Sequence, residues 1–440
     1  MKNVLFSGFA IFALVFASAN ACAGDIAPLF SRPANWRQKA AAYHKHLRKD
    51  GFRFADETGR VLYAAANRSN VLWNGMNVYE TKIMFGDVGF VERVEISLYN
   101  RGDDRSARGL STEGLERILE NVRSAMRNRT KPGEVEQVRR QGGYVYTQKF
   151  SGPSQNAELS WGVAAGSGAA KTVHFAKLTL LPPAAAVGAK QNSRMSSRQS
   201  RARSSTNVKS NIMRNSRGDV WIKNIPMVDQ GQKGYCAVAT AERVLRYFGN
   251  NVDEHELAQM AGSTAMGGTS SDALVKTVRR ICSNYSLGYE GILDMAPGTM
   301  RSIEEETERY NKTAKRLHEK QIAPDAFRQS FYGASGNSIS SKVLYEMRKR
   351  DYRREKFVSA VHEHINEGVP IIWGVRIGYY REPDIPQAEG GHIRLIVGYN
   401  DKTEEILYSD SWGSRHVLKK MPLDWAFTMT RQMFALKPLQ

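Results

Sequence analysis

The segment from Ile225 to Gly249 constrains the fold more than any other part of the sequence. A polar loop that contains several glycines ends at Cys236, and apolar residues then recur at the spacing of one helix face. These apolar residues are Val238, Ala241, Val244, Leu245 and Phe248. Gly249 follows them, where a left-handed helix end costs least. We therefore predict a helix that begins close to Cys236.

The position of Cys236 favours a reactive sulfur. A cysteine in the first turn of a helix lies among unpaired backbone N–H groups, at the positive end of the helix dipole. This environment favours the thiolate, which is the nucleophilic form. Gln230 precedes Cys236 by six residues, close enough in a compact turn for its side-chain amide to point where the Cys236 N–H points. Two such donors would form an oxyanion hole, so Gln230 is a candidate oxyanion donor.

Two further motifs follow in the second half of the chain. Gly390-Gly391-His392 opens an apolar strand, and Asp410-Ser411-Trp412-Gly413 follows the next one. Together with Gln-Gly-x-x-Gly-Tyr-Cys at residues 230–236, these motifs resemble those of papain-like cysteine peptidases. Within that group the chain is most similar to the bacteriocin-processing, double-glycine-leader type. The resemblance covers roughly residues 219–440 and implies a helix that bears the nucleophile, packed on an antiparallel sheet.

The resemblance implies a Cys-His-Asp triad made of Cys236, His392 and Asp410. Asp410 follows His392 by 18 residues, which is the length of a hairpin, so the two side chains can meet on adjacent strands. The carboxylate would fix the imidazole tautomer and favour imidazolium, which in turn favours the Cys236 thiolate. The resemblance also implies that Gly267 and Gly268 let a substrate backbone lie against the cleft wall.

The predicted function is an exported peptidase that hydrolyses polypeptides through a thioester at Cys236, with His392 as base and acid. The same residues would serve a transpeptidase, deamidase or acyltransferase, since these enzymes share every step up to the thioester. An inactive papain-like binding module is a third possibility. We expect no cofactor and no metal. The two histidine pairs His44/His46 and His362/His364 are each two residues apart, so on a helix they point to different faces.

The first 23 residues have the pattern of a secretory signal peptide. Lys2 precedes an apolar run from Val4 to Ala19, and small residues follow as far as Ala23. We expect cleavage after Ala23, with rival sites after Ala19 and Ala21, and hence a periplasmic or extracellular protein. The lipobox leucine is absent before Cys22, which argues against a lipoprotein tether. No later segment is apolar enough to predict a transmembrane span.

Two separate domains are expected after the signal peptide. Residues 24–183 show strand-like alternation, most clearly from Val91 to Tyr99, and one amphipathic helix opened by Ser111 or Thr112. They predict an accessory α+β domain with a mostly antiparallel sheet, and residues 219–440 predict the peptidase domain. The overall class is α+β. The accessory domain could bind substrate, anchor the protein or inhibit the enzyme, and its sequence favours none of these.

Residues 184–218 predict a disordered basic linker between the two domains. The segment has eight basic residues and no acidic one, and it offers almost nothing to bury. A solvated tether is the simplest interpretation, and contact with an acidic surface or polymer is an alternative. The net charge of +19 for the whole chain likewise predicts attraction to acidic partners without selecting among them.

Signal cleavage after Ala23 would leave two cysteines, Cys236 and Cys282. Two cysteines in an exported protein often form one disulfide. However, Cys282 ends an amphipathic helix, where it would be a small core residue. We therefore predict that Cys236 is a free thiol.

Overall fold

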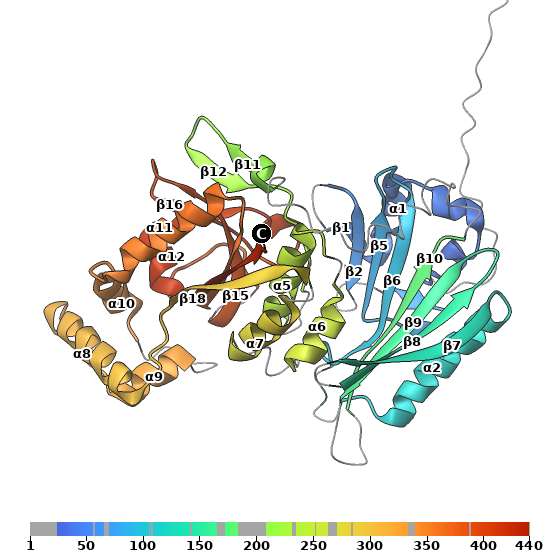
Figure 1. Ribbon diagram of the computed structural model, residues 1–440, viewed down its shortest axis with the longest axis horizontal. Helices are drawn as coiled ribbons and strands as arrows, with labels where there is room; N and C mark the ends of the chain where they lie inside the picture. The colour runs from blue at the N-terminus through green and yellow to red at the C-terminus, as the bar shows by residue number, and fades with distance from the viewer. Residues whose placement is uncertain are drawn as a thin grey trace, which may run out of the picture.

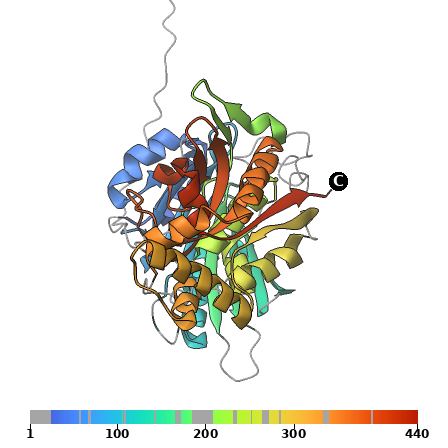
Figure 2. The same ribbon diagram turned by 90° about the vertical axis from the view of Figure 1, so that its left-hand side faces the viewer.

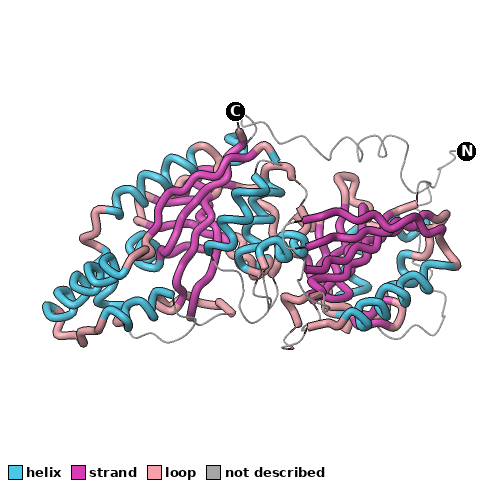
Figure 3. The backbone as a smooth tube through the Cα atoms, turned by 60° about the horizontal axis from the view of Figure 1, so that its bottom comes forward, coloured by secondary structure: helices cyan, strands magenta, loops and turns pink. Residues whose placement is uncertain are grey.

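The chain folds around two antiparallel sheets, each with its own hydrophobic core (Figure 1). The computed structural model describes residues 24–55, 58–65, 70–104, 106, 109–140, 143–164, 172–183, 208–230, 235–250, 252–262, 271–282, 285–332, 339–386 and 389–439. The predicted signal peptide lies outside the described residues. In Figure 3 the strands form two groups, each with helices beside it. The predicted α+β class is confirmed.

The N-terminal half contains an eight-stranded sheet in the order β1-β2-β5-β6-β10-β9-β8-β7. Its strands are β1 (Arg53–Phe54), β2 (Val61–Ala65), β5 (Glu80–Phe85), β6 (Val91–Asn100), β7 (Lys131–Arg140), β8 (Gly143–Ser151), β9 (Asn156–Ala164) and β10 (Val173–Leu181). A small hairpin pairs β3 (Leu72–Trp73) with β4 (Met76–Asn77). The remaining elements are helices α1 (Ala40–Leu47) and α2 (Thr112–Arg127) and 3-10 turns η1 (Ala27–Phe30), η2 (Pro33–Arg37) and η3 (Arg48–Asp50).

Local sequence explains most of these elements. In β6 the alternate residues Val94, Ile96 and Leu98 are buried, as their spacing predicts. The hydroxyl of Ser111 accepts a hydrogen bond from the Gly114 N–H at 3.1 Å, so it caps α2. Strand β7 was not predicted. All ten of its residues are exposed, and since it is held by pairing to β8 at the sheet edge, it has no apolar alternation to reveal it.

The C-terminal half contains the second sheet, in the order β11-β12-β15-β14-β18-β13; β16 also pairs with β15, and β17 pairs with β16. Its strands are β11 (Ile212–Arg214), β12 (Asp219–Ile222), β13 (Leu287–Asp294), β14 (Ile371–Ile377), β15 (Gly390–Asn400), β16 (Glu405–Ser409), β17 (Lys419–Pro422) and β18 (Thr430–Pro438). Its helices are α5 (Cys236–Tyr247), α6 (Glu254–Ala261), α7 (Ser271–Cys282), α8 (Met300–Arg316), α9 (Pro324–Tyr332), α10 (Ser341–Arg348), α11 (Arg353–Asn366) and α12 (Leu423–Met429). The 3-10 turns are η6 (Lys209–Asn211) and η8 (Ser414–His416).

Helix α5 packs against β15 through apolar and polar contacts. Its buried residues include Val238, Ala241 and Val244, and the Thr240 hydroxyl donates to the Ile393 carbonyl at 3.2 Å. Helices α8 and α9 lie at the opposite end of the molecule from the N-terminal half, so they are nearest the viewer in Figure 2. None of the described helices is long and apolar enough to cross a bilayer.

Part of the segment predicted as a linker, from residue 208 to residue 218, lies within the described residues. Residues 184–207 lie outside the described residues, whereas η6 and β11 both fall within the predicted linker. Strand β11 pairs with β12, with Ile212 opposite Ile222, and Val208 is buried in the C-terminal core. The polar composition of the segment hid these elements because β11 is short and is held by pairing with β12 and by a single apolar side chain, Ile212, that packs on the core.

Candidate active site

Helix α5 begins at Cys236, as the sequence predicts. The carbonyl of Tyr235 accepts the N–H of Ala239 at 2.7 Å, which forms the first helical turn around the sulfur. Cys236 is partly buried and is a free thiol, so that prediction is confirmed. Burial by itself raises the pKa of the Cys236 thiol, but a hydrogen bond to His392 and its charge outweigh burial, so the pKa is lower than that of an ordinary cysteine.

His392 lies near the start of β15 and is bonded through Nε2 to the carboxylate of Asp410. Strands β15 and β16 pair with Leu395 opposite Ser409, so the residue that follows β16 is brought to the His392 side of the sheet. Burial lowers the pKa of His392, but the Asp410 carboxylate outweighs burial and the pKa rises to about 9. Because Asp410 occupies Nε2, the Nδ1 nitrogen is the one left to exchange a proton with Cys236.

Trp412 covers the imidazole. Its ring stacks on that of His392 with centroids 4.2 Å apart and planes 12° apart, and His416 meets the other edge of the indole. His392 and Asp410 are 2% and 0% exposed, so the bond between them is shielded from water. Trp412 therefore packs over this bond.

Gln230 is tied to the loop that follows Asp410. Its backbone N–H donates to the Ser411 carbonyl at 2.8 Å, and its side-chain oxygen accepts the Ser411 hydroxyl at 2.6 Å. Since the carbonyl end of the amide is fixed in this way, the direction of its N–H groups is fixed too. The structure thus brings together four of the predicted residues: Gln230, Cys236, His392 and Asp410. Gly267 and Gly268 lie outside the described residues.

Arg394 is a buried residue of the site that the sequence analysis did not single out. Its guanidinium forms ion pairs with Asp410 at 3.0 Å and with Glu382 at 2.9 Å. The Tyr408 ring lies against it at 4.6 Å and donates its hydroxyl to Glu382. Burial raises the pKa of Asp410, but Arg394 and then His392 outweigh burial, so this carboxyl stays ionised. Alternation along β15 could have predicted this contact, because residues two apart on a strand share a face.

Arg243 was also missed. It lies on α5, almost wholly buried, and its guanidinium donates to the carbonyls of Pro226 at 2.9 Å and Asp410 at 3.0 Å and to the Ser409 hydroxyl at 2.5 Å. One side chain therefore connects the nucleophile helix to the end of β16, which fixes the backbone of Asp410 relative to α5.

Comparison with known proteins identifies the C-terminal half. Residues 222–433 match the Peptidase C39-like family. The predicted resemblance to this family is confirmed, and residues 222–433 are called the C39-like domain below. No curated protein matches the chain. Among solved structures, xylellain, a cysteine protease from Xylella fastidiosa, is similar at 12% identity over 53% of this chain and 89% of its own, with a TM-score of 0.27.

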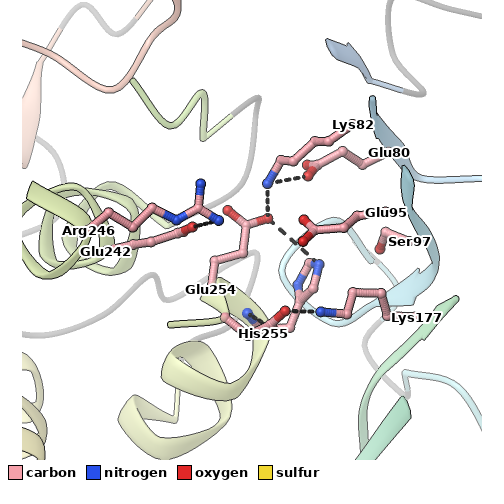
Figure 4. Close-up of a pocket in the computed structure, with 10 residues that line it drawn as sticks. Glu80, Lys82, Glu95, Ser97, Lys177, Glu242, Arg246, Glu254 and His255 are labelled. Carbon is pink, nitrogen blue, oxygen red and sulfur yellow. Dashed lines mark hydrogen bonds and ion pairs between the residues drawn. The ribbon is translucent and has the colours of Figure 1, made fainter. Parts of the chain in front are cut away.

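Three side chains near the C39-like domain's edge could in principle share a metal ion. They are Glu80 of the N-terminal half and Glu254 and His255 of α6, whose ligand atoms lie within 4.8 Å of one another. The Lys82 ammonium, however, lies 2.8 Å from Glu80 and 3.2 Å from Glu254 (Figure 4). Because a lysine ammonium already pairs with both carboxylates, the arrangement fits an ion-pair network better than a metal site.

The rate at which a small neutral reagent alkylates Cys236 should rise at a lower pH than for an ordinary thiol, whose pKa is about 8.5. The reason is that His392 lowers the thiol pKa. Peptide hydrolysis should then fall above about pH 9, where His392 loses the proton that a leaving group needs. Both titration steps belong to Cys236 and His392 as a coupled pair rather than to either residue alone. Parallel alkylation and hydrolysis profiles measure them, and a single thiol step near pH 8.5 would contradict the prediction.

Proposed function

We propose that this protein is an exported cysteine peptidase that hydrolyses peptide bonds of polypeptide substrates through a thioester at Cys236. The observations that carry the proposal are the place of Cys236 in the first turn of α5, the buried bond between His392 and Asp410, and the interaction of His392 with the thiol. This interaction lowers the thiol pKa, and the bond to Asp410 raises the imidazole pKa. Export is proposed because the first 23 residues have the pattern of a signal peptide. The basic residues of the segment 184–218 would attract acidic surfaces.

The proposed reaction has two stages. The Cys236 thiolate attacks the carbonyl carbon and forms a C–S bond, while the carbonyl oxygen becomes an oxyanion held by the Gln230 amide and the Cys236 N–H. The C–N bond then breaks, and His392 gives its proton to the departing amine. In the second stage His392 takes a proton from water, the hydroxide attacks the thioester, and the acid product leaves as the thiolate is restored.

Asp410 and its neighbours hold His392 ready for both stages. The carboxylate fixes the ring through Nε2, and the stacked Trp412 keeps the plane of the ring constant. Arg394 keeps Asp410 ionised, so the carboxylate accepts a hydrogen bond in every step.

Replacing Gln230 by alanine should reduce turnover by on the order of a hundredfold or more, because one oxyanion donor contributes about 3 kcal/mol. The Michaelis constant should change little, since the oxyanion exists only in the transition state. Steady-state kinetics on a fluorogenic peptide measure both quantities. Gln155→Ala is the matched control, as it removes an equally buried glutamine of the N-terminal half. A loss of turnover no greater than that of the control would exclude Gln230 from the oxyanion hole.

Mass spectrometry of a peptide library incubated with the mature chain tests the function itself. Two shorter peptides whose summed mass exceeds that of the substrate by one water indicate hydrolysis. Joined peptides would indicate a transpeptidase, and full-length peptides with a glutamine converted to glutamate would indicate a deamidase. An unchanged library, together with no labelling of Cys236 by a thiol-directed peptide warhead, would indicate a binding module and overturn the proposal.

A further inference from the structure

The N-terminal half lies beside α5, the helix that carries Cys236, and forms ion pairs with the next helix, α6. Figure 1 shows β2, β5 and β6 beside α5 and α6. Lys82 of β5 pairs with Glu254, Lys177 of β10 bonds to Asp253, and Arg140 of β7 pairs with Glu256 at 3.3 Å. Buried and half-buried ion pairs of this kind require a defined geometry between the two surfaces.

Tyr235, which immediately precedes Cys236, is inserted into the N-terminal half. Its side chain is 2% exposed, and its hydroxyl donates to the Oδ1 atom of Asn100 at 2.6 Å. Asn100 ends β6 and is itself fixed, because Oδ1 also accepts the Gly102 N–H at 2.8 Å and Nδ2 donates to Asp103 at 3.1 Å. The acceptor is therefore held in place by its own loop, independently of Tyr235.

Gly102 makes room for the Tyr235 ring. A Cβ atom at this position would lie 2.2 Å from Cε1 and 2.4 Å from Cζ of Tyr235, far inside van der Waals contact. The ring thus packs directly on the backbone of residue 102. A hydrogen bond at the hydroxyl and a flat backbone contact at the ring together form a socket, which we define as Asn100 and Gly102.

A fixed Tyr235 determines where α5 begins. Its carbonyl accepts the first bond of the helix, from Ala239, and Cys236 is the next residue along the chain. Farther along the same helix, Glu242 and Arg246 line one small cavity with Glu80, Lys82, Glu95 and Lys177 of the N-terminal half (Figure 4). The N-terminal half therefore contacts α5 both at its first turn and near its last one.

We propose that the N-terminal half is a positioning part of the active site, in which the Asn100–Gly102 socket holds Tyr235 and so places the Cys236 sulfur against His392. This inference rests on the proposed function, because it takes Cys236 to be the nucleophile. Asn100 and Tyr235 are positioning residues and need not touch substrate. A displacement of about 1 Å in a reacting atom can reduce a rate a hundredfold. Loss of the socket should therefore reduce the reactivity of the Cys236 sulfur.

Alkylation of Cys236 in the full-length mature chain tests this proposal without any substrate. The rate is measured against pH with iodoacetamide, and peptide mapping by mass spectrometry separates Cys236 from Cys282. Tyr235→Phe removes one oxygen atom, and Asn100→Leu removes the acceptor at similar volume. Each should slow alkylation at neutral pH by about tenfold to a hundredfold and move the thiol step to higher pH. Thermal melts confirm that each variant is folded.

Tyr247→Phe is the matched control, since Tyr247 ends the same helix and donates its buried hydroxyl to the Gly368 carbonyl at 2.9 Å, with no contact to the socket. It should leave the alkylation profile unchanged. Wild-type rates in both Tyr235→Phe and Asn100→Leu would overturn the proposal, as would faster alkylation, which would mean that the N-terminal half shields the sulfur. If the wild-type protein itself shows an ordinary thiol profile at Cys236, the proposed function is overturned as well. If the wild-type thiol is reactive and the two variants behave like it, only the positioning proposal fails.

Discussion

Replacing Cys236 by alanine should reduce peptide hydrolysis by on the order of 10⁴-fold or more. The variant lacks the sulfur that forms the thioester, so the remaining groups can only bind substrate and polarise its carbonyl. The helix should be preserved, since Cys236 is only partly buried and alanine favours helix. Turnover of a fluorogenic peptide, with active-site titration of the wild type, measures the loss.

Cys282→Ala is the control for that experiment. Cys282 is 3% exposed in the core, and burial raises its pKa to about 11, so it is a thiol rather than a thiolate at neutral pH. Its removal should leave turnover within about twofold of wild type and cost only the packing of one small side chain. Full activity in Cys236→Ala, or loss of activity in Cys282→Ala alone, would show that the nucleophile has been assigned wrongly.

Replacing Arg394 by methionine should lower the free energy of unfolding by about 3–5 kcal/mol. Methionine fills a similar volume but leaves Asp410 and Glu382 buried without the cation that joins them. The pKa of Asp410 should rise, because Arg394 is the main group that opposes the effect of burial. Urea unfolding followed by tryptophan fluorescence reports the stability loss.

Arg301→Met provides the comparison for Arg394. Arg301 pairs with Glu305 at 3.0 Å on the surface of α8, where both side chains are well exposed. Its loss should cost no more than about 0.5 kcal/mol. Equal stability of the two variants would mean that Arg394 contributes nothing beyond a surface ion pair.

The residues that act locally were predictable from the sequence. Helix α5 follows from apolar spacing and the glycine after it, and Cys236 follows from its place in the first turn. The meeting of His392 and Asp410 was predictable because two consecutive strands joined by a hairpin bring these positions together. In each case one stretch of chain carries the whole signal.

Contacts between distant segments were not predictable in this way. Asn100 and Tyr235 are 135 residues apart, and neither lies in a pattern that points to the other. Arginine is usually exposed on a helix, yet Arg243 is buried because acceptors of Pro226, Ser409 and Asp410 surround it. Strand β11 was missed for a related reason, since its pairing with β12 and the packing of Ile212 on the core both depend on distant segments.

The ion pair between Asp410 and Arg394 has a consequence for how such a centre can vary among homologous sequences. Together the two side chains carry no net charge, so the imidazole is oriented by a dipole rather than by a lone anion. An amide at position 410 combined with an uncharged residue at 394 would present the same total charge to His392, but it would leave Glu382, the other partner of Arg394, buried without its cation. We therefore expect positions 382, 394 and 410 to change together in evolution. A homologue that alters one of them alone should be less stable or should hold less of its imidazole in the protonated form.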